Sequence, residues 1–289
     1  FTMDAGGTYT VKLTVTDARG CCDDSDTLQI VIVDCVAPTC GVSGDTAACV
    51  GDEKNYVYSG DPGTGVDTYT WTYSGGTVVS GGGTTNNWIK IKWNTTGWVK
   101  LVVANECGTS TQCGKTVTVA DKPTCSISES ELLAVGYSAC VGDQRTYTYG
   151  GTGATSLQWS VVGGTIVGSS TGTSAVVQWT TAGTGTVSVT ASNGCGQVSC
   201  NISVTVGDDP VCTISGPTSG CVGDKGTFTS TGTGATAWDW DVVGGTFTGD
   251  GTSSIEVTWT SAGSKTVSLK VTNACGEATC SKTVTVGDD

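Results

Sequence analysis

The strongest constraint on the fold is a pattern that returns along the chain with a period of about 80–90 residues. Each full copy opens with Cys-Val-Gly-Asp, continues to a Trp before a Gly-Gly-Thr turn and to a second Trp, and then reaches an Asn-x-Cys-Gly turn. A unit of this length can bury a small core of its own, whereas repeats of about 20–50 residues need their neighbours to fold. The chain is therefore expected to be an array of domain-sized repeats.

The copies divide the chain into four segments. Residues 35–120, 121–207 and 208–289 each hold one full repeat, and residues 1–34 match only the last third of one. The sequence is therefore expected to be a window from a longer chain. A short linker with a Pro precedes each full repeat, and Pro restricts the backbone, so successive repeats are expected to lie end to end in a semi-rigid row.

Within each repeat the pattern predicts short strands. The strands are rich in Val and Thr and are separated by Gly-rich turns, as an antiparallel sandwich requires. In the segment 89–93 the alternate residues Ile89, Ile91 and Trp93 are expected to point inward, because side chains alternate between the two faces of a strand. The first Trp of each repeat should fill the middle of the core. The predicted fold class is all-β: tandem immunoglobulin-like antiparallel β-sandwiches.

The first 33 residues are expected to form two strands joined by an acidic turn. Alternation of apolar residues, among them Val11, Leu13 and Leu28, predicts one buried face for each strand. Two strands alone bury too little surface to be stable, so this segment needs further strands.

Fifteen cysteines give the clearest compositional signal, and each full repeat carries four. An even number per repeat fits a disulfide framework, and hence an oxidising, extracellular or cell-surface location. Zinc sites favour Cys-x-x-Cys pairs, which this sequence lacks. Four cysteines allow three pairings; the first of each repeat is expected to join one of the two beside the last hairpin. The disulfide candidates are Cys40, Cys49, Cys107, Cys113, Cys125, Cys140, Cys195, Cys200, Cys212, Cys221, Cys275 and Cys280.

Charge and composition exclude several classes of partner and chemistry. The formal net charge of −13 opposes binding to nucleic acid and to anionic membrane surfaces. No apolar run is long enough to span a membrane, so no membrane insertion is expected in the visible chain. Histidine is absent, which removes the commonest general base. Soluble proteins, glycans and divalent cations stay open as partners.

The landmarks of the repeat resemble those of a known family. Residues 9–20, Tyr-Thr-Val-Lys-Leu-Thr-Val-Thr-Asp-Ala-Arg-Gly, are similar to the end of a polycystic kidney disease (PKD) domain. The three later units resemble the PKD-like repeats of large bacterial surface proteins, including gliding adhesins. The resemblance covers essentially the whole chain and implies an immunoglobulin-like sandwich that serves as spacer, adhesive stalk or accessory module. A second pair of cysteines in each repeat departs from the usual pattern and suggests a demand for stability, since removing one disulfide from a small secreted domain costs about 2–5 kcal/mol.

Two groups of carboxylates are candidates for chemistry. Asp208 and Asp209 in a linker could hold calcium with Asp143, because Ca²⁺ takes hard oxygen ligands from loops, and the acidic turn at 23–24 is a similar candidate. Acidic residues in turns are more commonly solvated. Asp239 and Asp241 flank a Trp as a catalytic pair would, but the sister repeats carry Thr, Gln and Ser there, which indicates a polar outer face. No other cofactor is expected.

Exposed apolar residues indicate a contact surface with a neighbouring chain. Trp88 and Trp98 replace Ser or Thr of the other repeats and should point outward from opposite sheets, so a shared sugar-stacking platform is not expected. The inserted residues Leu132, Leu133 and Val135 extend this candidate interface. Glycosylation sequons begin at Asn94 and Asn201, a pattern that also arises by chance.

These observations predict a non-enzymatic extracellular structural or adhesive protein, part of a disulfide-stabilised bacterial surface fibre or stalk. Its partners would be further copies of itself in the fibre, or surface glycans and proteins. The alternative is a non-catalytic glycan-binding or spacer module of a secreted hydrolase. A catalytic domain in the flanking sequence would favour this alternative, whereas further repeats would favour the fibre.

Overall fold

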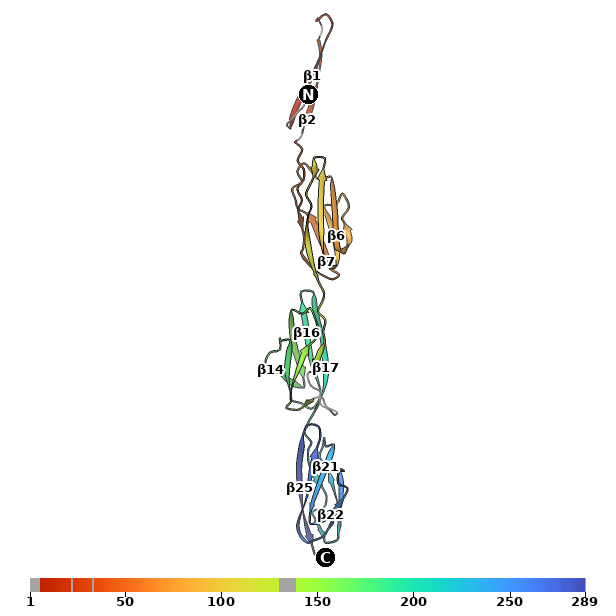
Figure 1. Ribbon diagram of the computed structural model, residues 1–289, viewed down its shortest axis with the longest axis vertical. Coiled ribbons are helices and arrows are strands. Elements are labelled where there is room, and N and C mark those ends of the chain that lie inside the picture. The colour runs from red at the N-terminus through yellow and green to blue at the C-terminus, as the bar shows by residue number, and fades with distance from the viewer. Residues whose placement is uncertain (1–5, 22, 33, 130–138, 289) are drawn as a thin grey trace. The chain divides into compact units, whose positions relative to one another are not determined.

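The computed structural model describes residues 6–21, 23–32, 34–129 and 139–288. Every regular element in these residues is a β-strand, which confirms the all-β fold class (Figure 1). The chain divides into two compact units, Phe1–Lys122 and Pro123–Asp289. Across the residues that the structure describes, no helix has the length and apolar character needed to cross a membrane.

The first unit contains a hairpin and a sandwich. Strands β1 (Gly7–Thr16) and β2 (Asp23–Ile32) pair antiparallel and form the hairpin. The sandwich that follows has the strand order β3-β5-β7-β9-β4, and β6 and β8 also pair with β7. Its strands are β3 (Val42–Ser43), β4 (Ala47–Cys49), β5 (Glu53–Tyr58), β6 (Thr68–Gly81), β7 (Trp88–Asn105), β8 (Gly108–Thr109) and β9 (Cys113–Ala120).

The hairpin corrects one expectation. The two predicted strands are present, but Asp23 and Asp24, which were expected in the turn, begin β2. The apolar residues of the strands are not buried: Leu13 and Leu28 are 65% and 63% exposed. The corresponding strands of a full repeat bury this face against a second sheet, whereas among the described strands β1 and β2 pair only with each other. Two paired strands have no second layer to cover an apolar face, so the alternation alone does not produce burial.

The second unit contains two sandwiches, each built from two four-stranded sheets (Figure 1). One has sheets β10-β12-β15-β14 and β11-β17-β16-β13, and the other has sheets β18-β20-β23-β22 and β19-β25-β24-β21. The strands of the first are β10 (Ile127–Glu129), β11 (Ala139–Cys140), β12 (Gln144–Tyr149), β13 (Ser156–Val162), β14 (Gly164–Val167), β15 (Ser174–Trp179), β16 (Gly183–Asn193) and β17 (Gly196–Gly207). Those of the second are β18 (Ile214–Ser215), β19 (Ser219–Cys221), β20 (Lys225–Ser230), β21 (Ala237–Val243), β22 (Gly245–Thr248), β23 (Ser254–Trp259), β24 (Gly263–Thr272) and β25 (Glu277–Gly287).

The first Trp of each repeat lies in the core, as predicted. Trp71, Trp159 and Trp240 are 9%, 2% and 3% exposed. Each indole N–H donates to a backbone carbonyl of the loop just before the strand that carries the second Trp, at 3.0, 2.8 and 2.9 Å. A buried indole needs such a partner, so this bond fixes the loop against the core.

The second Trp of each repeat confirms the inward alternation. In β7 the residues Ile89, Ile91 and Trp93 are no more than 1% exposed. The second Trp meets, edge-on, an aromatic ring of the strand paired with its own, with centroid distances of 6.0–6.3 Å. This geometry adds to the stabilisation from buried area. The pairs are Tyr56 with Trp93, Tyr147 with Trp179, and Phe228 with Trp259.

One glycine shows how closely the backbone approaches this second Trp. A Cβ atom added to Gly185 on β16 would lie 2.2 Å from a ring carbon of Trp179, which is fully buried. We expect Gly185→Ala to destabilise the protein by about 1–3 kcal/mol, because overpacking forces a buried ring or the backbone to shift. Urea unfolding followed by tryptophan fluorescence measures the change. Gly194→Ala is the matched control, since nothing lies within 4 Å of its added Cβ atom; equal effects of the two changes would contradict the packing argument.

A partly buried carboxyl makes the second sandwich sensitive to pH. The hydroxyl of Tyr147 donates to Oε1 of Glu129 at 3.2 Å. Burial raises the pKa of Glu129 above its ordinary value of 4.5, and the hydrogen bond from Tyr147 offsets part of this shift. On the surface of the first sandwich, the ammonium group of Lys90 instead lowers the pKa of Glu53.

These opposite shifts predict opposite pH effects. A raised pKa in the folded state means that the free energy of unfolding falls as pH rises from 4.5 through the folded pKa of Glu129. Glu129→Gln should therefore gain stability relative to the parent as pH rises from 4 to 7. Glu53→Gln should lose stability relative to the parent over the same range. The lowered pKa of Glu53 stabilises the folded parent only when its carboxyl is ionised, and ionisation increases as pH rises. Urea unfolding at several pH values tests both, and a gain for both variants would contradict the assignment.

Candidate functional site

The turns that carry disulfide-bonded cysteines are the most strongly repeated feature of the chain. The Asn-x-Cys-Gly turn connects β7 to β8, β16 to β17 and β24 to β25. In each copy Oδ1 of the Asn accepts a hydrogen bond from the backbone N–H of the Cys two residues later, at 2.8–2.9 Å. This bond closes a turn through the side chain, which fixes the direction of the Cys. The asparagines are Asn105, Asn193 and Asn273.

The same asparagine holds the linker. Nδ2 of Asn273 donates to the carbonyls of Asp208 and Gly234, both at 2.9 Å. Nδ2 of Asn105 likewise donates to the carbonyls of Val36 and Gly65, at 2.9 and 3.0 Å. One amide group therefore joins three segments: the turn, the linker before the repeat and a loop.

A second turn, Cys-Val-Gly-Asp, positions another cysteine of each repeat. In each Cys-Val-Gly-Asp sequence the Asp N–H donates to the Cys carbonyl at 2.9–3.1 Å. The Asp carboxylate accepts from the Cys N–H at 2.8–3.1 Å. The Gly has φ near +90° in all three copies, which a type II turn requires at its third residue and which favours glycine. The turn therefore presents its Cys in the same way each time.

One set of disulfides closes each sandwich internally. The first Cys of each repeat joins the second of the two hairpin cysteines, with Cα–Cα distances of 5.5–5.8 Å. The bond ties the entry of the chain into the repeat to its last long strand. The pairs are Cys40–Cys113, Cys125–Cys200 and Cys212–Cys280.

A second kind of disulfide crosses from one repeat to the next. Cys140, from the Cys-Val-Gly-Asp turn of the second sandwich, bonds Cys275, from the Asn-x-Cys-Gly turn of the third. This differs from the expectation of two disulfides inside each repeat. Each sandwich has its own internal pair, and its remaining two cysteines lie on separate turns, so Cys140 finds its partner in the neighbouring repeat.

The remaining cysteines differ in their bonding state. Cys49 and Cys195 are also disulfide-bonded. Among the described residues Cys21 and Cys221 carry free thiols. The expectation that Cys221 is bonded therefore does not hold in this structure.

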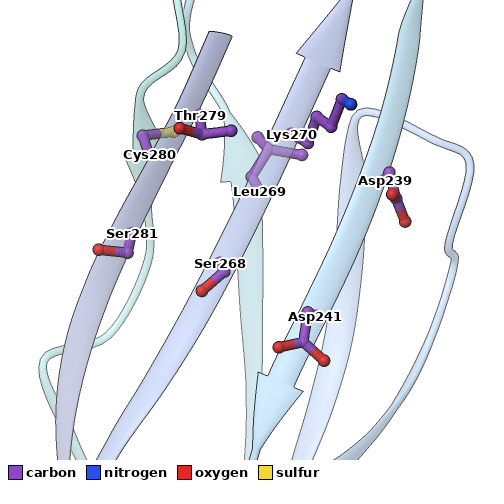
Figure 2. Close-up of a pocket in the computed structure, with 8 residues that line it drawn as sticks. All are labelled: Asp239, Asp241, Ser268, Leu269, Lys270, Thr279, Cys280 and Ser281. Atoms are coloured by element: carbon purple, nitrogen blue, oxygen red, sulfur yellow. The ribbon is translucent and has the colours of Figure 1, made fainter.

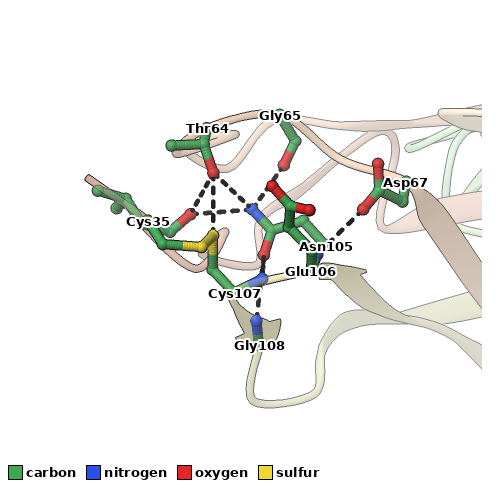
Figure 3. Close-up of a disulfide and its surroundings, with 9 residues drawn as sticks. Cys35, Thr64, Gly65, Asp67, Asn105, Glu106, Cys107 and Gly108 are labelled. Carbon is green, nitrogen blue, oxygen red and sulfur yellow. Dashed lines mark hydrogen bonds between the residues drawn. A yellow bond between two sulfur atoms is a disulfide. The ribbon is translucent and has the colours of Figure 1, made fainter. Parts of the chain in front are cut away.

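Cys107 bonds Cys35, which lies in the linker before the first sandwich (Figure 3). The hydroxyl of Thr64 lies 3.2 Å from Sγ of Cys107, and the carboxylate of Asp67 accepts from the Glu106 N–H at 3.0 Å. The two sulfur atoms and the carboxylate of Glu106 lie within 4.8 Å of one another, a spacing that suits a metal ion. Both sulfur atoms are already consumed in the disulfide, so they are not the thiolates that a metal would need.

The predicted calcium ligands do not form such a group. In the part of the chain that the structure describes, the one cluster with metal-binding spacing is that of Cys35, Glu106 and Cys107. The carboxylate of Asp143 instead accepts from the Cys140 N–H and pairs with Arg145 at 3.0 Å. Asp208 accepts from the backbone N–H of Asp209. Calcium binding stays a prediction without geometric support here.

The pair Asp239 and Asp241 lines a shallow groove on the outer face of β21, β24 and β25 (Figure 2). Asp239 lies opposite Lys270 in the strand register, and Lys270 forms an ion pair with Glu277 at 2.5 Å. The groove is the polar outer face that the comparison of the repeats predicted.

The two unusual tryptophans lie apart. Trp88 is 36% exposed and pairs with Val57 of β5, whereas Trp98 is half-buried and pairs with Thr116 of β9. The ammonium group of Lys100 lies 4.5 Å from the ring centroid of Trp98. Leu132, Leu133 and Val135 lie outside the described residues. The sequon asparagines Asn94 and Asn201 are exposed.

Comparisons with known proteins agree with the repeat pattern. The family model of the PKD-like domain matches three segments, residues 36–119, 123–206 and 208–286. The I-band fragment I67–I69 of titin is similar over 88% of this chain and 100% of that one, with 13% identity and a TM-score of 0.54. An E-to-A mutated variant of the same titin domains covers 87% and 99%, with 14% identity and a TM-score of 0.53. At this identity the similarity shows the fold alone, and no curated protein sequence matches the chain.

The two roles of the Asn273 side chain, in the turn and at the linker, can be tested separately. Asn273→Ala removes both the acceptor for the turn and the donor for the linker, and we expect the free energy of unfolding to fall by about 1–3 kcal/mol. Asn273→Asp keeps the oxygen that accepts from Cys275 but loses the donor to Asp208. Hydrogen exchange should therefore show the turn 273–276 still protected in the Asp variant and exposed in the Ala variant. Equal protection of this turn in both variants would contradict the assignment.

Proposed function

Because the chain belongs to the PKD-like domain family, whose sandwiches are typically non-catalytic structural modules, we propose that it is an extracellular structural or adhesive repeat protein. It would form a segment of a disulfide-stabilised surface fibre or stalk. The chain contains tandem immunoglobulin-like repeats with a disulfide inside each sandwich. Disulfides persist in oxidising compartments, which supports a location outside the cytoplasm.

The observation that carries this proposal is the position of the internal disulfides. They span sequence separations of 73, 75 and 68 residues. Tension along the chain enters a repeat just before its first Cys and leaves after its last strand. The disulfide transmits this tension directly, so the enclosed residues cannot be pulled out even when the sandwich unfolds.

The disulfide between repeats adds a second route for tension. From Cys125 the tension can pass through Cys200 and the linker to Cys212 and Cys280. It can also pass along the chain to Cys140 and then through Cys275. Two covalent routes in parallel mean that the loss of one bond does not release the chain. This redundancy suits an element that must keep its length under load.

The partners that suit this function are further copies of the repeat and other surface molecules. Trp88 would contribute to lateral contacts, because its large apolar side chain is partly exposed. The glycan-binding alternative needs an open aromatic ring. Trp98 suits it less well, because Lys100 covers its ring. We therefore place the fibre or stalk ahead of a binding module of a secreted hydrolase.

Stretching the chain between its ends tests the two routes. We expect Cys212→Ser/Cys280→Ser to lengthen the fully unfolded chain by less than about 5 nm, because Cys140–Cys275 still bypasses most of the enclosed residues. Adding Cys140→Ser/Cys275→Ser should release the full separation of 68 residues, about 24 nm at roughly 3.5 Å per residue. Single-molecule force spectroscopy without reducing agent measures both lengths.

The control is Cys140→Ser/Cys275→Ser alone, which should leave the unfolded length unchanged because the internal disulfides remain. A full release by the Cys212→Ser/Cys280→Ser variant would show that Cys140–Cys275 carries no tension. Unfolding of the parent chain to its full contour length without reduction would overturn the proposed mechanical function itself.

A further inference from the structure

The free thiol of Cys221 lies in the same local structure as the bonded Cys140. Cys140 pairs with Gly207 at the end of β17, and Cys221 pairs with Gly287 at the end of β25, both in parallel register. The Cys140 N–H donates to Asp143 at 3.0 Å, and the Cys221 N–H donates to Asp224 at 2.8 Å. Both turns therefore hold their Cys next to the point where the chain leaves the sandwich.

The partner of Cys140 shows what this position binds. Its sulfur is bonded to Cys275 of an Asn-x-Cys-Gly turn, whereas Cys221 is free and partly exposed. This bond is an observation independent of the free thiol. It shows that a Cys at this register position, Cys140, bonds the Cys of an Asn-x-Cys-Gly turn.

The residues after the strand repeat the rest of the binding geometry. The sequence Gly-Asp-Asp occurs at 207–209 and again at 287–289. At the first of these, the carbonyl of Asp208 accepts from Nδ2 of Asn273, two residues before the bonded Cys275. The second copy therefore provides the same sequence for an Asn-x-Cys-Gly turn to dock on.

We infer that Cys221 is half of a disulfide whose other half is the turn cysteine of an Asn-x-Cys-Gly hairpin in a further PKD-like repeat. In the 289 residues the three turn cysteines, Cys107, Cys195 and Cys275, are all disulfide-bonded, so the partner repeat lies outside this sequence. The inference rests on the proposed function, because it extends the covalent route for tension by one more junction.

The bond forms by oxidation of two thiols. Each thiol loses a proton and an electron, and the two sulfur atoms join. A disulfide donor such as glutathione disulfide accepts the two electrons and two protons and leaves as two thiols. The same chemistry serves a partner on the same polypeptide or on another one.

An extended chain tests the inference. A second copy of residues 210–289 placed after Asp289 restores the spacing between the second and third repeats. After oxidation with glutathione disulfide, alkylation of the unreduced protein and peptide mass spectrometry should find Cys221 bonded to the copy of Cys275. The alkylated fraction of Cys221 should fall at least tenfold relative to the 289-residue chain. Cys221→Ser in the extended chain is the matched control, and it should leave the copied turn Cys open to alkylation.

Two arms distinguish the sources of the partner. A disulfide within monomers of the extended chain indicates a partner on the same polypeptide. A disulfide between the 289-residue chain and the extended chain that carries Cys221→Ser indicates a partner on another polypeptide. Either result supports the inference.

One result overturns it: Cys221 alkylated equally in the extended and 289-residue chains, with Cys140–Cys275 intact and no new cross-linked peptide in either arm. The proposed function would then survive, because Cys221 takes part in neither tension route of the 289-residue chain.

Discussion

The disulfide between the second and third repeats depends on the backbone of a four-residue turn. Cys-Val-Gly-Asp forms a type II turn whose Gly takes a positive φ, and the N–H of this Gly donates to the carbonyl of the second core Trp at 2.8–2.9 Å. The turn is therefore fastened to the core of its own sandwich. Its Cys lies beside the last strand, where the chain leaves the repeat. This backbone is the same in all three copies, so each Cys takes the same register position beside the last strand.

Disulfides add stability that the small cores of these repeats do not provide by apolar burial alone. A sandwich of this size buries a limited apolar surface, and each core depends on two tryptophans and a few aliphatic residues. The internal disulfide protects a repeat against extension, and Cys140–Cys275 protects a junction. The asparagine amide supports the junction, since it fixes the turn Cys and the linker at once.

Much of the fold followed from periodicity. The recurrence of Trp, Gly-Gly-Thr and Asn-x-Cys-Gly predicted tandem sandwiches, and the alternation at Ile89, Ile91 and Trp93 identified their buried face. The same alternation failed at Leu13 and Leu28, because burial also needs a second sheet to cover the face. The candidate aspartates were read from composition in loops, which carries no information on distance. The carboxylate of Asp143 instead pairs with Arg145, two residues later at the start of β12.

The sequence by itself determined the repeat, the all-β class and the presence of a disulfide framework, since these depend on the order and spacing of residue types along the chain. Only the tertiary structure decided which cysteines meet. Four cysteines in a repeat suggest two internal pairs, but a disulfide needs two Cα atoms within about 7 Å. Cys140 meets that condition with Cys275, at a sequence separation of 135 residues, and the Cα atoms lie 5.5 Å apart. Spacing in sequence cannot reveal such a pair, because it depends on how two folded repeats face each other.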